Sequence, residues 1–65
     1  MNLILTLHAN EQMVERGISK RQVIDTIKKG SKVVKTDGFL ASYSYIKVAY
    51  KIKGDKYIVK TVMIR

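Results

Sequence analysis

The stretch ERGISKRQV, residues 15–23, decides how this chain folds, because it contains the end of one helix and the start of another. Gly17 suits the left-handed position just past a helix end, and Ile18 can pack back on the last turn. Ser19, with Gln22 three residues later, forms the capping-box pattern that begins a helix. The stretch therefore predicts two helices joined by a tight corner.

A corner of this kind also occurs in DNA-reading helix-turn-helix motifs, but the residues around Gly17 do not fit one. In that motif the residue four before the glycine is small, and the residues one and five before it are apolar. Here these positions hold Met13, Arg16 and Gln12, and Thr26 is a doubtful fit at a further apolar position. We therefore interpret the corner as an αα-hairpin that packs on a sheet.

The flanking segments extend this pattern in both directions. Good helix formers run from His8 to Arg16, with Ala9 and Met13 four residues apart on one face. The second helix begins after Ser19 and stops at Gly30, and its apolar stripe is Val23, Ile24 and Ile27. Before the first helix, the apolar run Leu3–Leu7 predicts a strand.

The rest of the chain has the pattern of strands joined by turns. The expected strands are residues 31–36, 39–45, 46–53 and 56–64, and the expected hairpin turns are Asp37–Gly38 and Gly54–Asp55. A further turn or bulge near Ser44–Tyr45 is needed to bring the apolar residues of the two middle strands to one side. The order β-α-α-β-β-β predicts one α+β domain, residues 1–65, with two helices on one face of a small antiparallel sheet.

A two-residue turn at Gly54–Asp55 fixes the register of the last hairpin. It pairs Ile52 with Tyr57, Tyr50 with Val59, Val48 with Thr61 and Ile46 with Met63, which makes one face of the hairpin apolar. The opposite face then carries basic residues from both strands, with Val62 among them. These basic residues are Lys47, Lys51, Lys53, Lys56 and Lys60.

Composition and charge restrict the function. The 65 residues include no cysteine and carry a net charge of +8, and twelve of the 13 Lys and Arg lie in residues 20–65. Such an excess favours polyanions, with nucleic acid first and an anionic membrane second. A lysine-rich solubilising surface is the alternative interpretation. No apolar run is long enough to span a bilayer and the start lacks a signal-peptide pattern, so we expect a soluble cytoplasmic protein, monomeric or homodimeric, with no membrane partner.

The segment LHANEQMVERGISKRQV, residues 7–23, resembles the opening of a small family known as domain of unknown function 4258. The matching residues are His8, Ala9, Met13, Glu15, Arg16, Gly17, Ile18, Ser19 and Val23. The strand around Thr61 resembles the family's last strand, whereas Gln12 departs from the arginine that the family often has. The family's architecture resembles that of RelE/ParE-type toxins, small β-α-α-β-β-β proteins of which many cut RNA without metal.

This resemblance implies an RNA-directed, toxin-like protein, either a metal-independent endoribonuclease or a degenerate relative of one. His8 and Arg16 are then the candidate catalytic residues, since a histidine can take the 2′-hydroxyl proton and an arginine can stabilise the charge on the phosphate. Both lie with Gln12 on one polar stripe of the first helix. In the structural alternative, His8 caps the helix and Arg16 pairs with Glu11 or with a helix-end carbonyl.

The candidate binding residues are lysines. We expect Lys47, Lys51, Lys53, Lys56 and Lys60 to hold phosphates, with RNA ahead of DNA as the partner. One alternative is a non-catalytic nucleic-acid-binding module, and another is an interaction protein whose basic sheet binds an acidic partner such as an antitoxin. Tyr43 or Tyr45 is a candidate for base stacking, while Tyr50 and Tyr57 point to the core. A single histidine and scattered carboxylates give no metal-ligand pattern, and no cofactor is expected.

Overall fold

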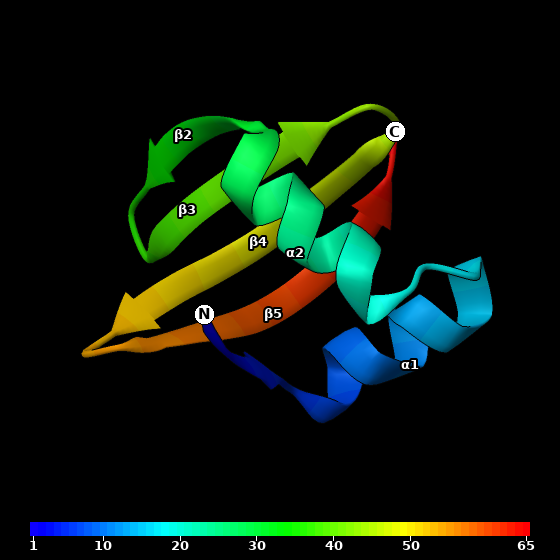
Figure 1. The fold of residues 1–65 in the computed structure, drawn as a ribbon, viewed down its shortest axis with the longest axis horizontal. Helices are drawn as coiled ribbons and strands as arrows, with labels where there is room; N and C mark the ends of the chain where they lie inside the picture. The colour runs from blue at the N-terminus through cyan, green and yellow to red at the C-terminus, as the bar shows by residue number, and fades with distance from the viewer.

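The computed structural model describes residues 1–65 as two helices lying on one side of a five-stranded sheet (Figure 1). The elements in chain order are β1 (Asn2–Leu5), α1 (Leu7–Arg16), α2 (Lys20–Lys29), β2 (Ser31–Lys35), β3 (Gly38–Tyr43), β4 (Ile46–Lys53) and β5 (Lys56–Ile64). The predicted α+β fold and its element order are confirmed. Neither helix is long and apolar enough to cross a membrane.

The strand order across the sheet is β1-β5-β4-β3-β2. Strands β2 to β5 form an antiparallel meander, as predicted, but β1 runs parallel to β5, so the sheet is mixed. The reason is that β1 and β5 are the two ends of the chain and no hairpin joins them. The first strand covers the β5 edge of the meander, so the first and last strands of the chain become neighbours in the sheet (Figure 1).

Three element boundaries differ from those expected. Leu7 belongs to α1 and not to the first strand, because Thr6 ends the extended segment and its side chain accepts a hydrogen bond from the N–H of Ala9. The β2–β3 turn is one residue earlier than predicted, since Gly38 already pairs with Lys35. Strand β3 ends at Tyr43 and not at residue 45. The turn that follows it, at Ser44–Tyr45, brings the apolar residues of β3 and β4 to the same side of the sheet, as expected.

The corner at Gly17 has the predicted form. Gly17 has φ 67° and ψ 34°, and its N–H donates to the carbonyl of Val14. The N–H of Ile18 donates to Met13 O at 2.9 Å, which completes a Schellman motif, and the Ile18 side chain is buried. Ser19 then begins α2 with the reciprocal capping box expected from Gln22.

The register of the β4–β5 hairpin changes halfway along. Tyr50 pairs with Val59 as predicted, but the next pairs are Ala49 with Thr61 and Val48 with Val62. Lys60 is the extra residue of a β-bulge, which shifts every later pair by one position. The predicted pairs of Val48 with Thr61 and of Ile46 with Met63 are therefore wrong. Val62 faces the core and not the basic face.

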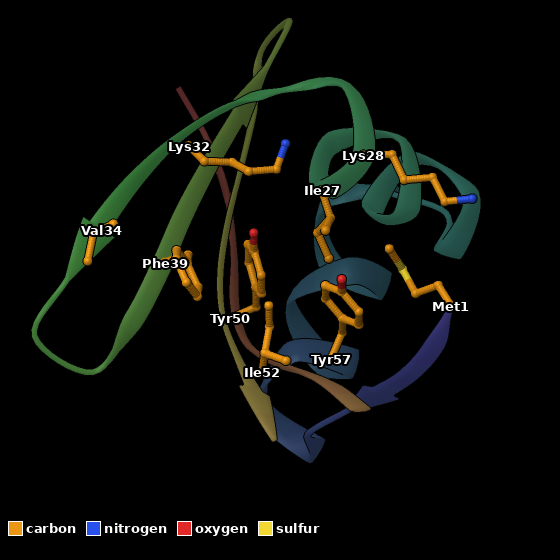
Figure 2. Close-up of a pocket in the computed structure, with 9 residues that line it drawn as sticks. All are labelled: Met1, Ile27, Lys28, Lys32, Val34, Phe39, Tyr50, Ile52 and Tyr57. Atoms are coloured by element: carbon orange, nitrogen blue, oxygen red, sulfur yellow. The ribbon is translucent and has the colours of Figure 1, made fainter. Parts of the chain in front are cut away.

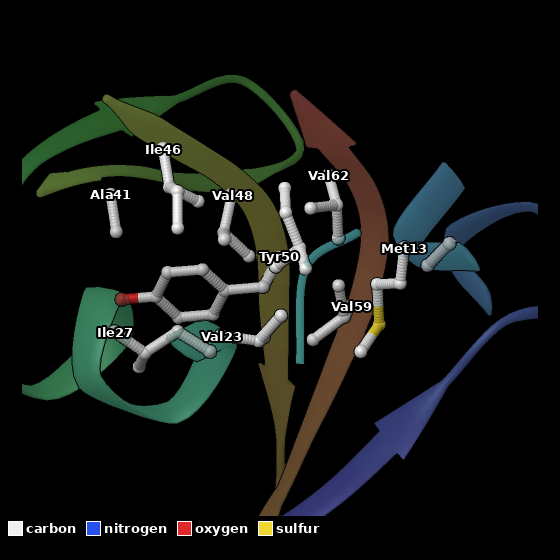
Figure 3. Close-up of a cluster of buried hydrophobic side chains, with 11 residues drawn as sticks. Met13, Val23, Ile27, Ala41, Ile46, Val48, Tyr50, Val59 and Val62 are labelled. Atoms are coloured by element: carbon white, nitrogen blue, oxygen red, sulfur yellow. The ribbon is translucent and has the colours of Figure 1, made fainter. Parts of the chain in front are cut away.

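The core lies between the helices and the middle strands (Figure 3). Its members are Ala9, Met13, Ile18, Val23, Ile27, Ala41, Ile46, Val48, Tyr50, Val59 and Val62. Helix α1 packs on β5, and α2 packs on β3 and β4. Because both helices cover the same face, the opposite face of the sheet has no helix on it (Figure 1).

Candidate nucleic-acid interface

Alternation along β4 places its lysines on the helix-free face of the sheet. Ile46, Val48 and Tyr50 are buried under the helices, so the residues between them point the other way. Lys47 is half-buried by its neighbours, and Lys51 is exposed. The prediction that this strand has a core side and a basic side is therefore confirmed.

The tip of the β4–β5 hairpin brings two more lysines together. Lys53 and Lys56 are direct cross-strand partners on either side of the Gly54–Asp55 turn, and both are exposed. Gly54 has φ 63°, the positive value that the first residue of a type II′ turn requires. This turn leaves the two ammonium groups on adjacent strands with no ion pair to either of them.

Lys60 differs from the other four predicted phosphate contacts. Its Nζ donates to the backbone carbonyl of Asp37 at 2.8 Å and lies 3.5 Å from the Asp37 carboxylate. Its side chain is 33% exposed. The bulged residue therefore ties β5 to the β2–β3 turn, and its charge is partly neutralised by an aspartate that is distant in sequence.

We refer to Lys47, Lys51, Lys53, Lys56 and Lys60 as the lysine face. Three of the five acidic residues of the chain, Glu11, Glu15 and Asp25, lie on the helices and so on the other side of the molecule. The other two, Asp37 and Asp55, lie in turns at the margin of the lysine face. The lysine face therefore has few acidic neighbours, and four of its five lysines make no ion pair.

The two candidate catalytic residues do not share a site. His8 and Arg16 are both exposed and lie eight residues apart on α1, about 12 Å along the helix axis. Neither lines any of the three surface hollows of the molecule. The structural roles considered for them are absent as well, because Thr6 caps the helix and Arg16 makes no ion pair or side-chain hydrogen bond.

Gln12, on the helix turn between them, has a different role from the one its sequence position suggests. Its side-chain oxygen accepts a hydrogen bond of 2.9 Å from the backbone N–H of Val62 on β5. Strand β1 has already ended at the level of Val59, so this part of the β5 edge has no strand partner. Gln12 thus satisfies an edge donor and joins α1 to the sheet.

The largest hollow contains residues that the sequence did not single out. It is an open groove of about 390 Å³ on the helix side, lined by Met1, Ile27, Lys28, Lys32, Val34, Phe39, Tyr50, Ile52 and Tyr57 (Figure 2). The paired valines of β2 were the available signal, since two adjacent apolar residues leave one on each face of a strand. This signal does not locate the groove, because whether α2 covers the Val34 side of β2 depends on where that helix ends.

The aromatic rings of Phe39, Tyr50 and Tyr57 lie side by side along this groove (Figure 2). Phe39 stacks on Tyr50 with ring centroids 5.5 Å apart, and Tyr57 lies 6.0 Å from Tyr50 on the other side. Burial, together with the neighbouring Tyr57, raises the pKa of the Tyr50 phenol above its ordinary value of 10.0. Tyr43 and Tyr45 are exposed as expected, but Tyr45 accepts a hydrogen bond from Gln22.

Comparison with known proteins gives one match. Residues 5–64 match the model of a family described as "Domain of unknown function (DUF4258)", in agreement with the resemblance seen in the sequence. No curated protein and no solved structure matches the chain. The likeness to RelE/ParE-type toxins therefore stays a prediction.

Proposed function

This chain belongs to the DUF4258 family, and we propose that it is an RNA-binding protein that holds phosphates with the lysine face of its sheet. The observation that carries the proposal is the set of four lysines without an ion pair, Lys47, Lys51, Lys53 and Lys56, on a face that no helix covers. Ammonium groups held on neighbouring strands bind a phosphate chain by releasing its counterions.

The shape of this face favours RNA over duplex DNA. Reading of B-DNA in the major groove requires a protruding helix or ribbon, and the corner at Gly17 is occupied with packing its helices on the sheet. Single-stranded RNA, by contrast, can lie along a flat charged surface, and no part of the protein has to insert into a groove. The half-buried apolar side chains between the lysines, such as Ala49 and Ile58, add contact area for bases.

Cleavage is the second candidate function, and the separation of its two residues argues against it. Metal-independent cleavage requires a base and a cation at the same phosphate. His8 and Arg16 lie two helix turns apart, and the turn between them is held by the Gln12 bond to β5. We therefore expect no RNA fragments when the wild-type protein is incubated with total RNA in EDTA. Fragments that disappear in His8→Ala while RNA binding persists would establish the nuclease instead.

Charge reversal on the lysine face tests binding. We expect Lys51→Glu with Lys53→Glu to weaken the affinity for single-stranded RNA by at least about tenfold without lowering the melting temperature, because both side chains are exposed. The matched control is Lys20→Glu with Lys29→Glu, which makes the same change in net charge on α2. Equal losses in the two double variants would show that only net charge matters, and the lysine face would then not be a site.

The salt dependence of binding gives an independent measure of the same contacts. Each phosphate neutralised in a single strand contributes roughly 0.7 to the slope of log affinity against log salt concentration, so four lysines predict a slope of about 3. The variant without Lys51 and Lys53 should keep roughly half of it. A wild-type slope close to zero would contradict phosphate binding altogether.

A further inference from the structure

The groove on the helix side exposes apolar surface that the two helices leave uncovered. Val34 is 76% exposed, and Met1 and Ile52 are about half exposed (50% and 45%). Figure 2 shows Val34 at one end of the groove and Met1 at the other, with the aromatic rings between them. A continuous apolar hollow with charged rims is typical of a surface that binds another molecule.

One side of this groove is a free strand edge. Strand β2 is the last strand of the sheet, and all five of its residues are exposed. The edge strand pairs only with β3, so alternate backbone N–H and C=O groups of Ser31–Lys35 face solvent. Val34 and Lys32 belong to this strand and also line the groove, which makes the edge and the groove one surface.

The floor of the groove contains a polar group without a partner in the protein. Tyr50 as a whole is only 2% exposed, but its hydroxyl, which makes no hydrogen bond to any protein atom, is not buried and meets solvent at the groove (Figure 2). A hydroxyl that meets solvent bonds to water, and a bound molecule that displaces this water must supply a hydrogen-bond partner in its place. A carbonyl or carboxylate of a bound molecule supplies such a partner.

The charges around the groove specify the sign of what binds there. Lys28 and Lys32 are among its lining residues, and none of the nine lining residues is acidic. Lys35 is on the same edge strand but points to the other face of the sheet, with Val33, because side chains alternate along a strand. A second copy of the chain, with its own +8 charge and its own edge lysines, is therefore repelled, whereas an acidic segment is attracted.

We propose that this surface binds an extended acidic segment of a partner protein, which pairs with β2 as a sixth strand. The backbone of that segment satisfies the free edge of β2. Its inward side chains are apolar where they cover Val34 and the adjacent groove, and acidic where they lie near Lys28 and Lys32. The site is separate from the lysine face, which lies on the opposite side of the sheet, and it does not depend on RNA binding.

The probe is a fluorescent peptide of about eight residues, the length of a long strand, with leucine and glutamate in turn on one face and threonine on the other. Its polarisation on titration with the protein should show saturable binding, and the same peptide with lysine in place of each glutamate should not bind. Val34→Glu should weaken the acidic peptide by at least about tenfold. The matched control Val33→Glu makes the same charge change one residue away, on the other face of β2, and should cost less than about threefold. Equal effects of the two variants, or no binding of the peptide, would overturn the proposal.

Hydrogen exchange shows how the peptide binds. Addition of a sixth strand should slow exchange of the edge amides within Lys32–Lys35, whereas a helix lying in the groove would leave them unchanged and contradict the proposal. Lys51→Glu with Lys53→Glu should leave peptide affinity within about threefold, so failure of RNA binding and failure of peptide binding are distinguishable. If Val34→Glu instead weakens RNA as much as it weakens the peptide, the groove belongs to the nucleic acid and the partner segment is excluded.

Discussion

At the scale of single residues, long-range hydrogen bonds explain side chains whose sequence context suggests something else. Gln12 lies on an otherwise polar stripe of α1, where it looks available for a ligand, but its oxygen holds the N–H of Val62. Thr6, at the start of α1, also binds to β5. Its N–H donates to the Val59 carbonyl and its hydroxyl donates to the Lys60 carbonyl. Together the two residues close the β5 edge beyond the end of β1.

The Gln12 bond predicts a loss of stability that is not accompanied by a change in RNA affinity. Gln12→Ala leaves the partly buried Val62 N–H without a partner, and we expect a loss of ~1–3 kcal/mol in the free energy of unfolding. Gln12→Glu keeps an acceptor at the same place and should lose less. Urea denaturation of the three proteins measures both values. If alanine and glutamate behaved alike, the hydrogen bond would not be the stabilising contact.

At the scale of the elements, two glycines end the two helices for different reasons. Gly17 has a left-handed backbone, and a Cβ atom there would meet no atom within 4 Å. Gly30 has φ −74°, which any residue adopts, but a Cβ atom there would lie 2.5 Å from the Ser42 carbonyl oxygen and from that of Thr26. The first glycine is required by backbone conformation, and the second by the close approach of α2 to β3.

These two causes predict different responses to substitution. Gly17→Ala should cost on the order of 1 kcal/mol, and Gly17→Asn should recover much of it because asparagine tolerates the left-handed region. Gly30→Ala should cost ~1–3 kcal/mol or more from overpacking, and Gly30→Asn should be no better. Thermal melts of the four variants make the comparison. Recovery by asparagine at Gly30 would show that the contact with β3 is not the cause.

At the scale of the whole molecule, the distribution of charge separates two surfaces. The five residues of the lysine face lie on the side of the sheet without helices. The other side has the acidic residues of the helices and the groove. The excess of eight positive charges acts on both surfaces, since like charges on so small a body repel one another. The sharpest case is Lys53 opposite Lys56 at the hairpin tip.

This self-repulsion predicts opposite effects of salt on folding and on binding. Raising NaCl from ~10 mM to ~150 mM shortens the Debye length to about 8 Å, so the melting temperature of the free protein should rise by a few degrees. Over the same range the affinity for RNA should fall, because phosphate contacts release counterions. Differential scanning calorimetry and binding titrations in matched buffers check the two signs. A melting temperature that falls with salt would mean that favourable ion pairs outweigh the repulsion.

The candidate site was partly predictable for a clear physical reason. The lysines of β4 follow from strand alternation next to buried residues, and the pairing of Lys53 with Lys56 follows from a two-residue turn. The engagement of Lys60 with Asp37 did not follow, since the two residues are 23 positions apart and meet only across the assembled sheet. The groove was missed for the same reason, because exposure of Val34 depends on what the helices leave uncovered.

Features whose hydrogen bonds close within a few residues follow from the amino-acid sequence alone. These are the corner at Gly17, the capping box of Ser19 and Gln22, and the bounds of β4 and β5 around a tight turn. The parallel pairing of β1 with β5 and the bulge at Lys60 that turns Val62 inward depend instead on contacts that form only in the complete fold. The first pairing joins the first and last strands of the chain, and the strand beyond the bulge is held by Gln12 of α1. Local pattern cannot specify such contacts, because their energy is gained only when the whole core packs.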